Sequence, residues 1–309
     1  MTLPLTFTCP ACGRALDEVA ADELRCDAEG VTYRRQEGVW RLLAPAREEA
    51  LARFISEYET VRRGEGRGAT DAAYYRALPF SDLSGKFSAD WAIRAASFRA
   101  LLARVVAPLE DGLERAPVTL DLGAGCGWLS YRLAQRGHTV LAVDLQTNAT
   151  DGLGAHQHYD ASFVPVQAEF DRLPLAAGVA DLVVFNAALH YATDYVTTLT
   201  EALRVLRHGG IIAILDSPVY SHSGSGQRMV REREADFSRR FGFPSNAIPS
   251  EQYLTGARLR DLAAALGLRW RVSTPAHGVR FAWRRWKKRL IAGRESARFP
   301  LIVAWKETS

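Results

Sequence analysis

The sequence predicts a doubly wound α/β domain, in which a mainly parallel sheet carries helices on both faces. From residue 118 onward, short apolar runs recur and turn residues bound each of them. Such runs are typical of strands that are buried on both faces of a parallel sheet. Stretches with helical periodicity alternate with these runs. A glycine-rich turn also joins the first run to the first of these helices, as dinucleotide-type sites require.

The chain has 309 residues, which exceeds what one hydrophobic core usually organises, so we expect more than one unit. Composition shifts place a small β-rich module at 1–44, a helical linker or cap at 45–115, and the α/β domain at 116–309. Within this last unit, we expect a lid insert at 217–249 and a basic segment at 278–299.

Individual elements follow from apolar periodicity and from capping and breaking residues. We expect strands over 118–122, 140–143, 182–185, 211–215, 269–273 and 301–305, and helices over 45–63, 88–107, 129–136, 195–206, 227–241 and 250–266. The second helix should end before Pro108, because proline cannot continue the hydrogen-bond pattern of a helix. Residues 221–226, which are serine and glycine with one histidine, are expected to be mobile.

Composition and charge exclude several classes of protein. Apolar residues make up 48% and charged residues 24%, which is ordinary for a globular chain and unlike a disordered, collagen-like or coiled-coil protein. No apolar run approaches the length of a membrane span. The first residues lack the basic stretch of a secretory signal, and four cysteines are too few for a disulfide scaffold. We therefore expect a protein of the reducing cytoplasm.

Positive charge is concentrated in one place. The net charge is +4, yet residues 280–298 hold eight basic residues and one acidic residue, so the rest of the chain is net negative. Aromatic residues alternate with these cations, which would suit phosphate and base contacts in RNA. An amphipathic helix on an anionic membrane and a solvated face whose tryptophans dock on the sheet are the other interpretations.

A glycine-rich loop follows the first predicted strand, with the sequence Asp121-Leu-Gly123-Ala-Gly125-Cys-Gly127. Glycines let a ligand approach the backbone, and the helix that follows offers free N–H groups. The dinucleotide fingerprint is G-x-G-x-x-G, whereas the third glycine here comes one position early. Asp121 also stands two positions before the first glycine, where a carboxylate would repel a pyrophosphate and attract an amine.

Two further acids are expected at the same edge of the sheet. Asp144 ends the second strand, where an acid can accept both hydroxyls of a ribose. Glu169 follows the third strand and precedes Leu173-Pro174. Ligands of open α/β sheets bind outside the carboxyl ends of the strands, so these acids should surround one ligand.

Taken together, these motifs resemble those of class I S-adenosylmethionine-dependent methyltransferases. The resemblance covers the glycine loop, Asp144, Glu169, the fourth strand that ends at Asn186, and Gly209-Gly210. It implies a Rossmann-like methyltransferase sheet with S-adenosyl-L-methionine as methyl donor. The donor-binding residues that it implies are Asp121, Gly123, Ala124, Gly125, Gly127, Asp144, Leu145, Glu169, Phe170 and Asn186. Asp121 would orient the ammonium, Asp144 the ribose and Glu169 the adenine amino group.

Candidates for a catalytic base follow strands four and five, near the expected position of the acceptor. They are His190, Tyr191 and Asp216, with Tyr220 and His222 as further candidates. A base is needed only if the nucleophile arrives protonated. For each of these residues, a structural or solvated role is the alternative.

Three cysteines in the first module have the spacing of a zinc knuckle and the start of a second one. Two residues separate Cys9 from Cys12, and Cys26 follows. The module resembles the zinc ribbons of some ribosomal-RNA guanine methyltransferases and of small methyltransferase activators, which implies structural zinc. No histidine occurs in residues 1–44, so only a carboxylate, from Asp27 or Glu29, or water could complete the site. The alternative is a ribbon without metal, held by its apolar core.

We therefore expect a methyltransferase that acts on a small-molecule acceptor, because a lid and a net-negative body suit such a substrate. The alternatives are an RNA base methyltransferase, which the ribbon-like module and residues 280–298 favour, and a non-catalytic scaffold that binds the donor. Turnover and salt-sensitive RNA affinity distinguish these three functions.

Overall fold

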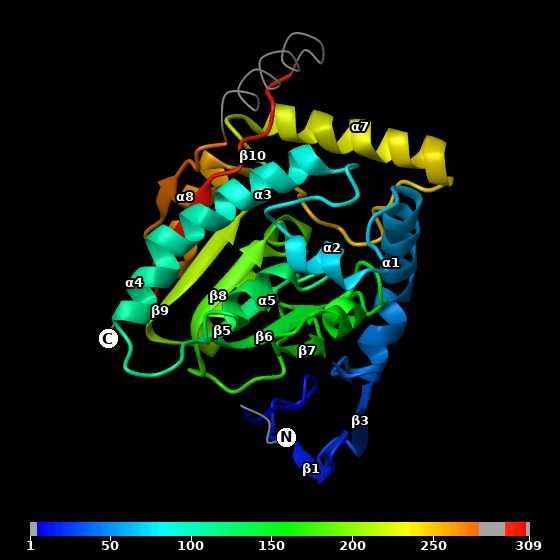
Figure 1. The fold of residues 1–309 in the computed structure, drawn as a ribbon, viewed down its shortest axis with the longest axis vertical. Coiled ribbons are helices and arrows are strands. Elements are labelled where there is room, and N and C mark those ends of the chain that lie inside the picture. Colours follow the sequence, from blue (N-terminus) through cyan, green and yellow to red (C-terminus); the bar gives the residue numbers. More distant parts are fainter. Residues whose placement is uncertain (1–4, 278–293, 307–309) are drawn as a thin grey trace.

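The computed structural model describes residues 5–277 and 294–306. A twisted central sheet lies between layers of helices, and α1, α3 and α7 gather above one of its edges (Figure 1). The strands are β1 Asp17–Ala20, β2 Glu23–Cys26, β3 Val31–Gln36, β4 Val39–Arg41, β5 Val118–Leu122, β6 Thr139–Asp144, β7 Val164–Gln167, β8 Ala180–Asn186, β9 Leu206–Leu215, β10 Val219–Tyr220, β11 Leu254–Thr255, β12 Arg271–Ser273 and β13 Leu301–Trp305. The helices are α1 Pro45–Gly64, α2 Ala72–Ala77, α3 Ser88–Leu101, α4 Ala107–Asp111, α5 Trp128–Ala134, α6 Tyr195–Val205, α7 Ser223–Phe241 and α8 Gly256–Leu266, and short helical turns lie at Leu102–Val106, Leu153–His158 and Leu189–Tyr191.

The prediction of a doubly wound α/β sheet is confirmed. The sheet has the order β1-β2-β3-β4-β7-β6-β5-β8-β9-β13-β12. The strands from β4 through β7, β6, β5 and β8 to β9 are parallel to their neighbours. β13 joins β9 in the antiparallel sense. The strand order reverses beside β5, so its carboxyl end opens onto a crevice of the kind that binds ligands in such sheets.

The two faces of the sheet support separate hydrophobic cores. One core contains Val183 and Phe185 of β8 together with side chains from α6 and α8. The other contains Leu182 and Val184 of the same strand, with side chains from α3 and α5. Because successive side chains of a strand point to opposite faces, a strand covered on both sides must be apolar at nearly every position. This explains the continuous apolar runs of the sequence.

The helix expected over 88–107 does not end before Pro108. α3 passes into a π-helical turn at Leu102–Val106 and then into α4, which has Pro108 in its first turn. The backbone N–H of Ala107 bonds to the carbonyl of Leu102, five residues back. This wider turn lets the chain pass through a position where proline supplies no N–H.

Several other boundaries differ from the prediction, and β9 begins five residues early, at Leu206. α8 starts at Gly256 and not at residue 250, since Thr255 accepts a hydrogen bond from the backbone N–H of Arg258 and caps the helix. Residues 223–226, expected to be mobile, form the first turn of α7. A Cβ at Gly226 would lie 2.4 Å from the ring of Tyr253, so this turn packs closely on the chain that precedes α8.

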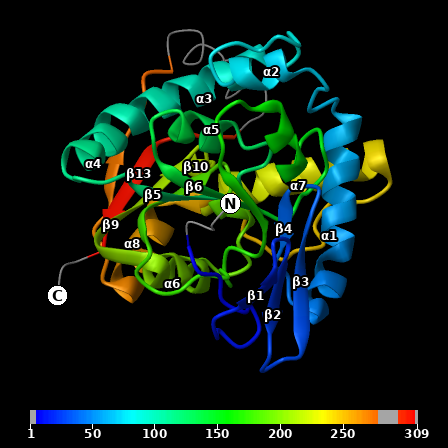
Figure 2. The same cartoon turned by 60° about the horizontal axis from the view of Figure 1, so that its bottom comes forward.

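The N-terminal strands extend the central sheet. β4 pairs in parallel with β7, with Trp40 opposite Val166, and β1–β4 lie beside α1 (Figure 2). The backbone N–H of Thr8 also donates to the carbonyl of Pro174 at 3.0 Å. Trp40 and Cys9 belong to the same buried cluster as β5 and β8 side chains. The module is thus built onto the α/β body.

No helix in residues 5–277 or 294–306 is both long enough and apolar enough to cross a membrane. Most of the basic segment, residues 278–293, lies outside the described residues.

Candidate functional site

A cavity of about 600 Å³ opens at the carboxyl ends of β5, β6, β8 and β9. Its floor is the glycine loop after β5, and its walls come from α1, α3 and α7. Of the predicted site residues, those that line the cavity are Gly123, Ala124, Gly125, Asp144, Asn186, His190, Tyr191 and Asp216. Four segments that are far apart in sequence therefore meet at the edge where the sequence places a ligand.

The glycine loop needs glycine for more than one reason. Gly123, Gly125 and Gly127 all have positive φ angles, of 76°, 54° and 78°, which other residues rarely adopt. A Cβ at Gly123 would lie 2.3 Å from the Cβ of Ala188, and one at Gly127 would lie 2.6 Å from the ring of Phe163. At Gly125, the nearest atom to such a Cβ is 3.7 Å away. Of the three glycines, Gly125 alone could carry a Cβ without a steric clash, and it borders the cavity.

Asp121 lies directly beneath this loop and is 1% exposed. Its Oδ2 accepts a hydrogen bond from Ser130 Oγ at 2.8 Å, whereas its Oδ1 has no partner among the described residues. Burial raises the pKa of Asp121 to about 7. A buried carboxylate oxygen without a donor is costly to maintain, and an ammonium group would supply one. Asp121 itself does not line the cavity.

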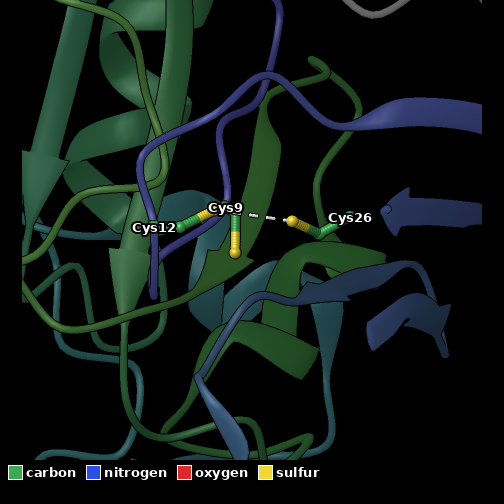
Figure 3. Close-up of side chains that lie close together, drawn as sticks. All are labelled: Cys9, Cys12 and Cys26. Carbon is green, nitrogen blue, oxygen red and sulfur yellow. Dashed lines mark hydrogen bonds between the residues drawn. The ribbon is translucent and has the colours of Figure 1, made fainter. Parts of the chain in front are cut away.

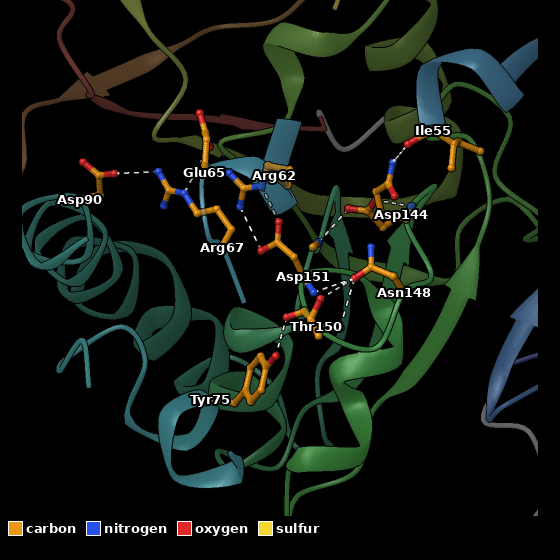
Figure 4. A network of polar contacts seen from close by, with 12 residues as sticks. Ile55, Arg62, Glu65, Arg67, Tyr75, Asp90, Asp144, Asn148, Thr150 and Asp151 are labelled. Atoms are coloured by element: carbon orange, nitrogen blue, oxygen red, sulfur yellow. Dashed lines mark hydrogen bonds and ion pairs between the residues drawn. The ribbon is translucent and has the colours of Figure 1, made fainter. Parts of the chain in front are cut away.

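Asp144 borders the cavity at the end of β6. Its Oδ2 accepts from the backbone N–H of Gly125 and its Oδ1 from that of Gln146, both at 2.8 Å. Burial raises its pKa. A carboxylate has about four acceptor positions, so two remain for hydroxyl groups of a ligand. The side chain of Gln146 in turn donates to the carbonyl of Ile55 in α1 at 3.0 Å (Figure 4).

Four of the predicted donor residues besides Asp121 do not line the cavity, namely Gly127, Leu145, Glu169 and Phe170. Glu169 forms a two-pronged ion pair with Arg47 of α1, with bonds of 3.0 Å and 2.6 Å. Phe170 packs edge-on against Phe185, with ring centroids 6.0 Å apart. Contact of Glu169 with an adenine stays a prediction, which requires this carboxylate to accept a further hydrogen bond beside Arg47.

The cavity rim on the α1 side contains ion pairs that the sequence does not signal. Arg62 pairs with Asp151 after β6, and Arg67 pairs with Asp90 of α3 at 3.0 Å (Figure 4). Tyr75 of α2 donates to the carbonyl of Thr150 at 2.5 Å. Each contact joins segments separated by more than twenty residues, so no local motif reveals it.

The candidate bases lie at the far end of the cavity from Asp144. His190 is buried, and its Nδ1 is 3.3 Å from Ser217 Oγ. Burial, followed by the charges of Arg233 and Arg94, lowers its pKa to about 3, so its imidazole is neutral at physiological pH and is a weak base. Tyr191 packs edge-on against Tyr58 of α1, with centroids 5.9 Å apart.

Asp216 adopts a positive φ of 56° directly after β9. Its Oδ1 accepts from Ser97 Oγ of α3 at 2.6 Å, and its Oδ2 is buried without a partner among the described residues. Burial raises its pKa. The Oδ1 of Asn186 is also buried and unpaired in the described structure. Tyr220 lines the cavity, whereas His222 is exposed before α7.

The three cysteines of the N-terminal module converge, with their sulfur atoms within 4.8 Å of one another (Figure 3). The closest pair is Cys12 and Cys26, at 3.5 Å. Thiolates around a tetrahedral zinc are about 3.8 Å apart, given Zn–S bonds of about 2.3 Å. Neither Asp27 nor Glu29 joins this group within the described residues, and Asp27 pairs with Arg25 at 2.8 Å.

Comparison with known proteins identifies the central part of the chain. Residues 120–214 match the methyltransferase domain family. A malonyl-(acyl-carrier protein) O-methyltransferase of Geobacter sulfurreducens is 35% identical over 133 residues, which cover 41% of this chain and 48% of that protein. A trans-aconitate 2-methyltransferase of Azoarcus is 34% identical over 152 residues, or 49% of this chain and 55% of that protein. The chain thus spans about half the length of these curated relatives.

Among solved structures, an S-adenosylmethionine-dependent methyltransferase from Mesorhizobium loti is similar, with a TM-score of 0.45 and 18% identity. The match covers 64% of this chain and 96% of that chain.

Proposed function

We propose that this protein, which contains a methyltransferase domain at residues 120–214, transfers a methyl group from S-adenosyl-L-methionine to a small-molecule acceptor. The observation that carries the proposal is the meeting of the glycine loop, Asp144 and Asn186, which all lie within this domain, at one cavity. The name of one relative, a trans-aconitate 2-methyltransferase, supports a small acceptor, and another relative is named for a malonyl group on an acyl-carrier protein.

The residues present fit the donor. The open face of Gly125 admits the methionine portion, Asp121 accepts from its ammonium directly or through water, and Asp144 accepts from the ribose hydroxyls. When bound, the donor supplies a methyl group on a sulfonium, so alignment of the acceptor provides much of the rate. Asn186 shapes the wall between the two ends of the cavity.

At the acceptor end, neutral His190 accepts a proton from an acceptor that arrives protonated. Tyr191 and Asp216 orient that acceptor. We propose these roles because the three side chains line the cavity beyond Asn186 and because a base within hydrogen-bond reach is what such a step requires.

Transfer of radiolabelled methyl from the donor into a host extract tests the reaction. The extract is separated afterwards into RNA, protein and small-molecule fractions, and label should enter the small-molecule fraction. Label in RNA would support the RNA methyltransferase alternative. Donor binding by calorimetry without label in any fraction would support the scaffold alternative.

Replacement of Asp144 by alanine tests the donor site separately, with Asp160→Asn as control. Asp160 lies between β6 and β7, outside the cavity, and pairs with Arg76. Asp144→Ala should weaken donor affinity at least tenfold in calorimetry, since it removes the ribose acceptor. Equal affinity in the two variants would refute the ribose assignment.

We also propose that Cys9, Cys12 and Cys26 hold a structural zinc ion, with water as the fourth ligand. The convergence of three sulfurs supports this, and the absence of a nearby carboxylate within the described residues leaves that position to water. Elemental analysis should find about one zinc per chain in the wild type and much less in Cys12→Ser. A wild-type protein without zinc would leave the ribbon as a metal-free module.

Two broader expectations are retained as proposals. None of the four cysteines forms a disulfide in the described structure, which supports the reducing cytoplasm as the location. Limited proteolysis tests the division at residues 44 and 115. Cleavage at residue 115 should precede cleavage at residue 44, where the chain is buried.

A further inference from the structure

Two arginines line the cavity without an acidic partner at ion-pair distance among the described residues. They are Arg94 of α3 and Arg233 of α7. The other cavity arginines are neutralised: Arg62 by Asp151, Arg67 by Asp90, and Arg294 by Glu232. Arginine in a partly enclosed site is normally paired, so two unpaired guanidinium groups in one cavity call for a negatively charged ligand.

The charges of both arginines act on His190, where each disfavours the protonated ring. The charge of Arg94 also acts on Asp216 and on Cys126 of the glycine loop, so Arg94 lies between the two ends of the cavity. Asp216 is the one acid of the described cavity lining at the acceptor end, because Asp90 and Asp151 are paired and Asp144 binds backbone N–H groups on the donor side. With His190 neutral, two cations therefore face a single carboxylate.

The guanidinium of Arg233 is fixed and still has a free donor. Its Nη2 donates to Oε1 of Gln252, and its carbon lies 6.0 Å from the centroid of the Tyr191 ring. The backbone N–H of Gln252 in turn donates to the carbonyl of His190 at 3.1 Å. The Nε of Arg233 is buried and has no partner in the described part of the chain. A buried donor without an acceptor is unfavourable, and an oxyanion would satisfy it.

Arg94 is positioned by aromatic contacts. Its guanidinium carbon lies 4.9 Å from the centroid of the Trp91 ring, and Trp91 packs edge-on against Trp128 at 6.0 Å. Such stacking holds the planar group in place and leaves its N–H donors available. Tyr58, Tyr191 and Tyr220 provide apolar surface on the same cavity.

We propose that the methyl acceptor is an organic anion, with an apolar body and at least one carboxylate or phosphate group that Arg94 and Arg233 bind. This inference rests on the proposed methyltransferase function. The arginine fork recognises both anions by paired N–H donors, so they share one chemistry at this site. Tyrosine rings contact the apolar body, and Asp216 orients a hydroxyl or amine.

The test uses the full-length protein with Arg94→Gln, Arg233→Gln and two matched controls. Arg99→Gln on α3 and Arg231→Gln on α7 remove exposed arginines outside the cavity. Small molecules of a host extract are separated on an anion-exchange column before they are offered with labelled donor. The compounds that accept the labelled methyl group should bind to the column and elute with salt. With that fraction, the KM for acceptor should rise at least tenfold in both cavity variants and stay within twofold of wild type in the controls.

Donor affinity, measured by calorimetry, should be unchanged in all four variants. Loss of donor affinity in Arg94→Gln or Arg233→Gln would assign that residue to the donor carboxylate and overturn its place in the acceptor site. Methyl transfer only into unretained compounds would overturn the inference while leaving the proposed function intact.

A binding measurement separates the inference from turnover. Benzoate, phenyl phosphate, benzamide and benzylamine are each titrated into the protein that is saturated with donor product, S-adenosylhomocysteine, and followed by ligand-observed NMR. One or both anions should bind and the other two compounds should not, with binding lost in Arg233→Gln. Comparison of the affinities for benzoate and phenyl phosphate shows whether the site prefers a carboxylate or a phosphate. If the anions bind but no methyl transfer occurs in the extract experiment, the proposed function is refuted and the anion site stands. If benzamide binds as tightly as benzoate, the inference of an anion site is refuted.

Discussion

Replacing Asp121 with asparagine should stabilise the fold at neutral and alkaline pH. The carboxyl group is 1% exposed and one of its oxygens lacks a partner among the described residues. Burial raises its pKa from 3.8 to about 7. The native state thus binds this proton more tightly than the unfolded chain does, and the contribution of Asp121 to stability falls as pH rises from about 4 to about 7. Asparagine has no proton to lose and keeps an acceptor for Ser130.

The size of the effect follows from the pKa difference. A shift of about three units at about 1.4 kcal/mol per unit gives up to about 4 kcal/mol above pH 7 and almost nothing at pH 4. Urea unfolding at pH 4, 6 and 8 measures this difference. Asp261→Asn, an exposed change on α8, is the control and should show no such trend. A constant difference between wild type and Asp121→Asn at all three pH values would refute the reasoning.

The same variant tests the proposed role of Asp121 in donor binding. An ammonium group binds the ionised carboxylate, so donor affinity of the wild type should fall about tenfold per unit as pH decreases from 6.5 to 5. Asp121→Asn should bind more weakly at pH 7 and lack this dependence. If Asp121→Asn is more stable than the wild type but binds the donor equally well, the Asp121 carboxylate does not contact the donor ammonium.

Three other changes test the packing around the site. Asp181→Asn should lower the free energy of unfolding by about 2 kcal/mol at pH 7, because two arginines hold the pKa of Asp181 at about 2. This stabilisation is present above pH 3.8 and is lost as the pH falls from 3.8 towards 2. Trp40→Ala should cost about 3–5 kcal/mol in urea unfolding, since it empties a fully buried site. Gly123→Ala should lower the melting temperature, and Ala188→Gly in the same chain should restore part of it, because the clash is removed and the φ strain remains. No recovery in that double variant would contradict the clash.

The donor side of the site was predictable from the sequence because it is local. The glycine loop, Asp144 and Asn186 each follow a strand with a clear apolar run, and the parallel sheet brings those strand ends together. The partner of Glu169 could not be predicted in this way. Arg47, 122 residues earlier, binds its carboxylate, and contact of Glu169 with an adenine stays a prediction.

The acceptor side could not be predicted in this way. Arg94 and Arg233 lie on helices whose sequences also carry exposed arginines, so periodicity does not distinguish the cavity residues from the solvated ones. Their common feature, a missing acidic partner within the described residues, depends on how α3 and α7 lie over the sheet. The helix through Pro108 shows a similar limit, because the proline itself does not tell whether the helix stops there or continues through a π turn.

The N-terminal module takes part in the site through the helix that it positions. β4 pairs with β7, and the backbone N–H of Leu42 continues that ladder to the carbonyl of Gln167 at 2.9 Å. α1 begins three residues later and is tied to the strand ends by Arg47 on Glu169, by the carbonyl of Ile55 on Gln146, and by Arg62 on Asp151. These three contacts follow one another along α1.

A loosened N-terminal module would therefore shift α1 and open the donor end while leaving the glycine loop in place. Trp40→Ala should for this reason weaken donor affinity as well as the fold, even at temperatures where the protein stays folded. Gly123→Ala changes the loop itself and leaves the N-terminal module intact, so it serves as the comparison. Resistance of α1 to proteolysis should fall in the first variant only. If α1 stays protected in Trp40→Ala while donor affinity is unchanged, the N-terminal module has no part in closing the cavity.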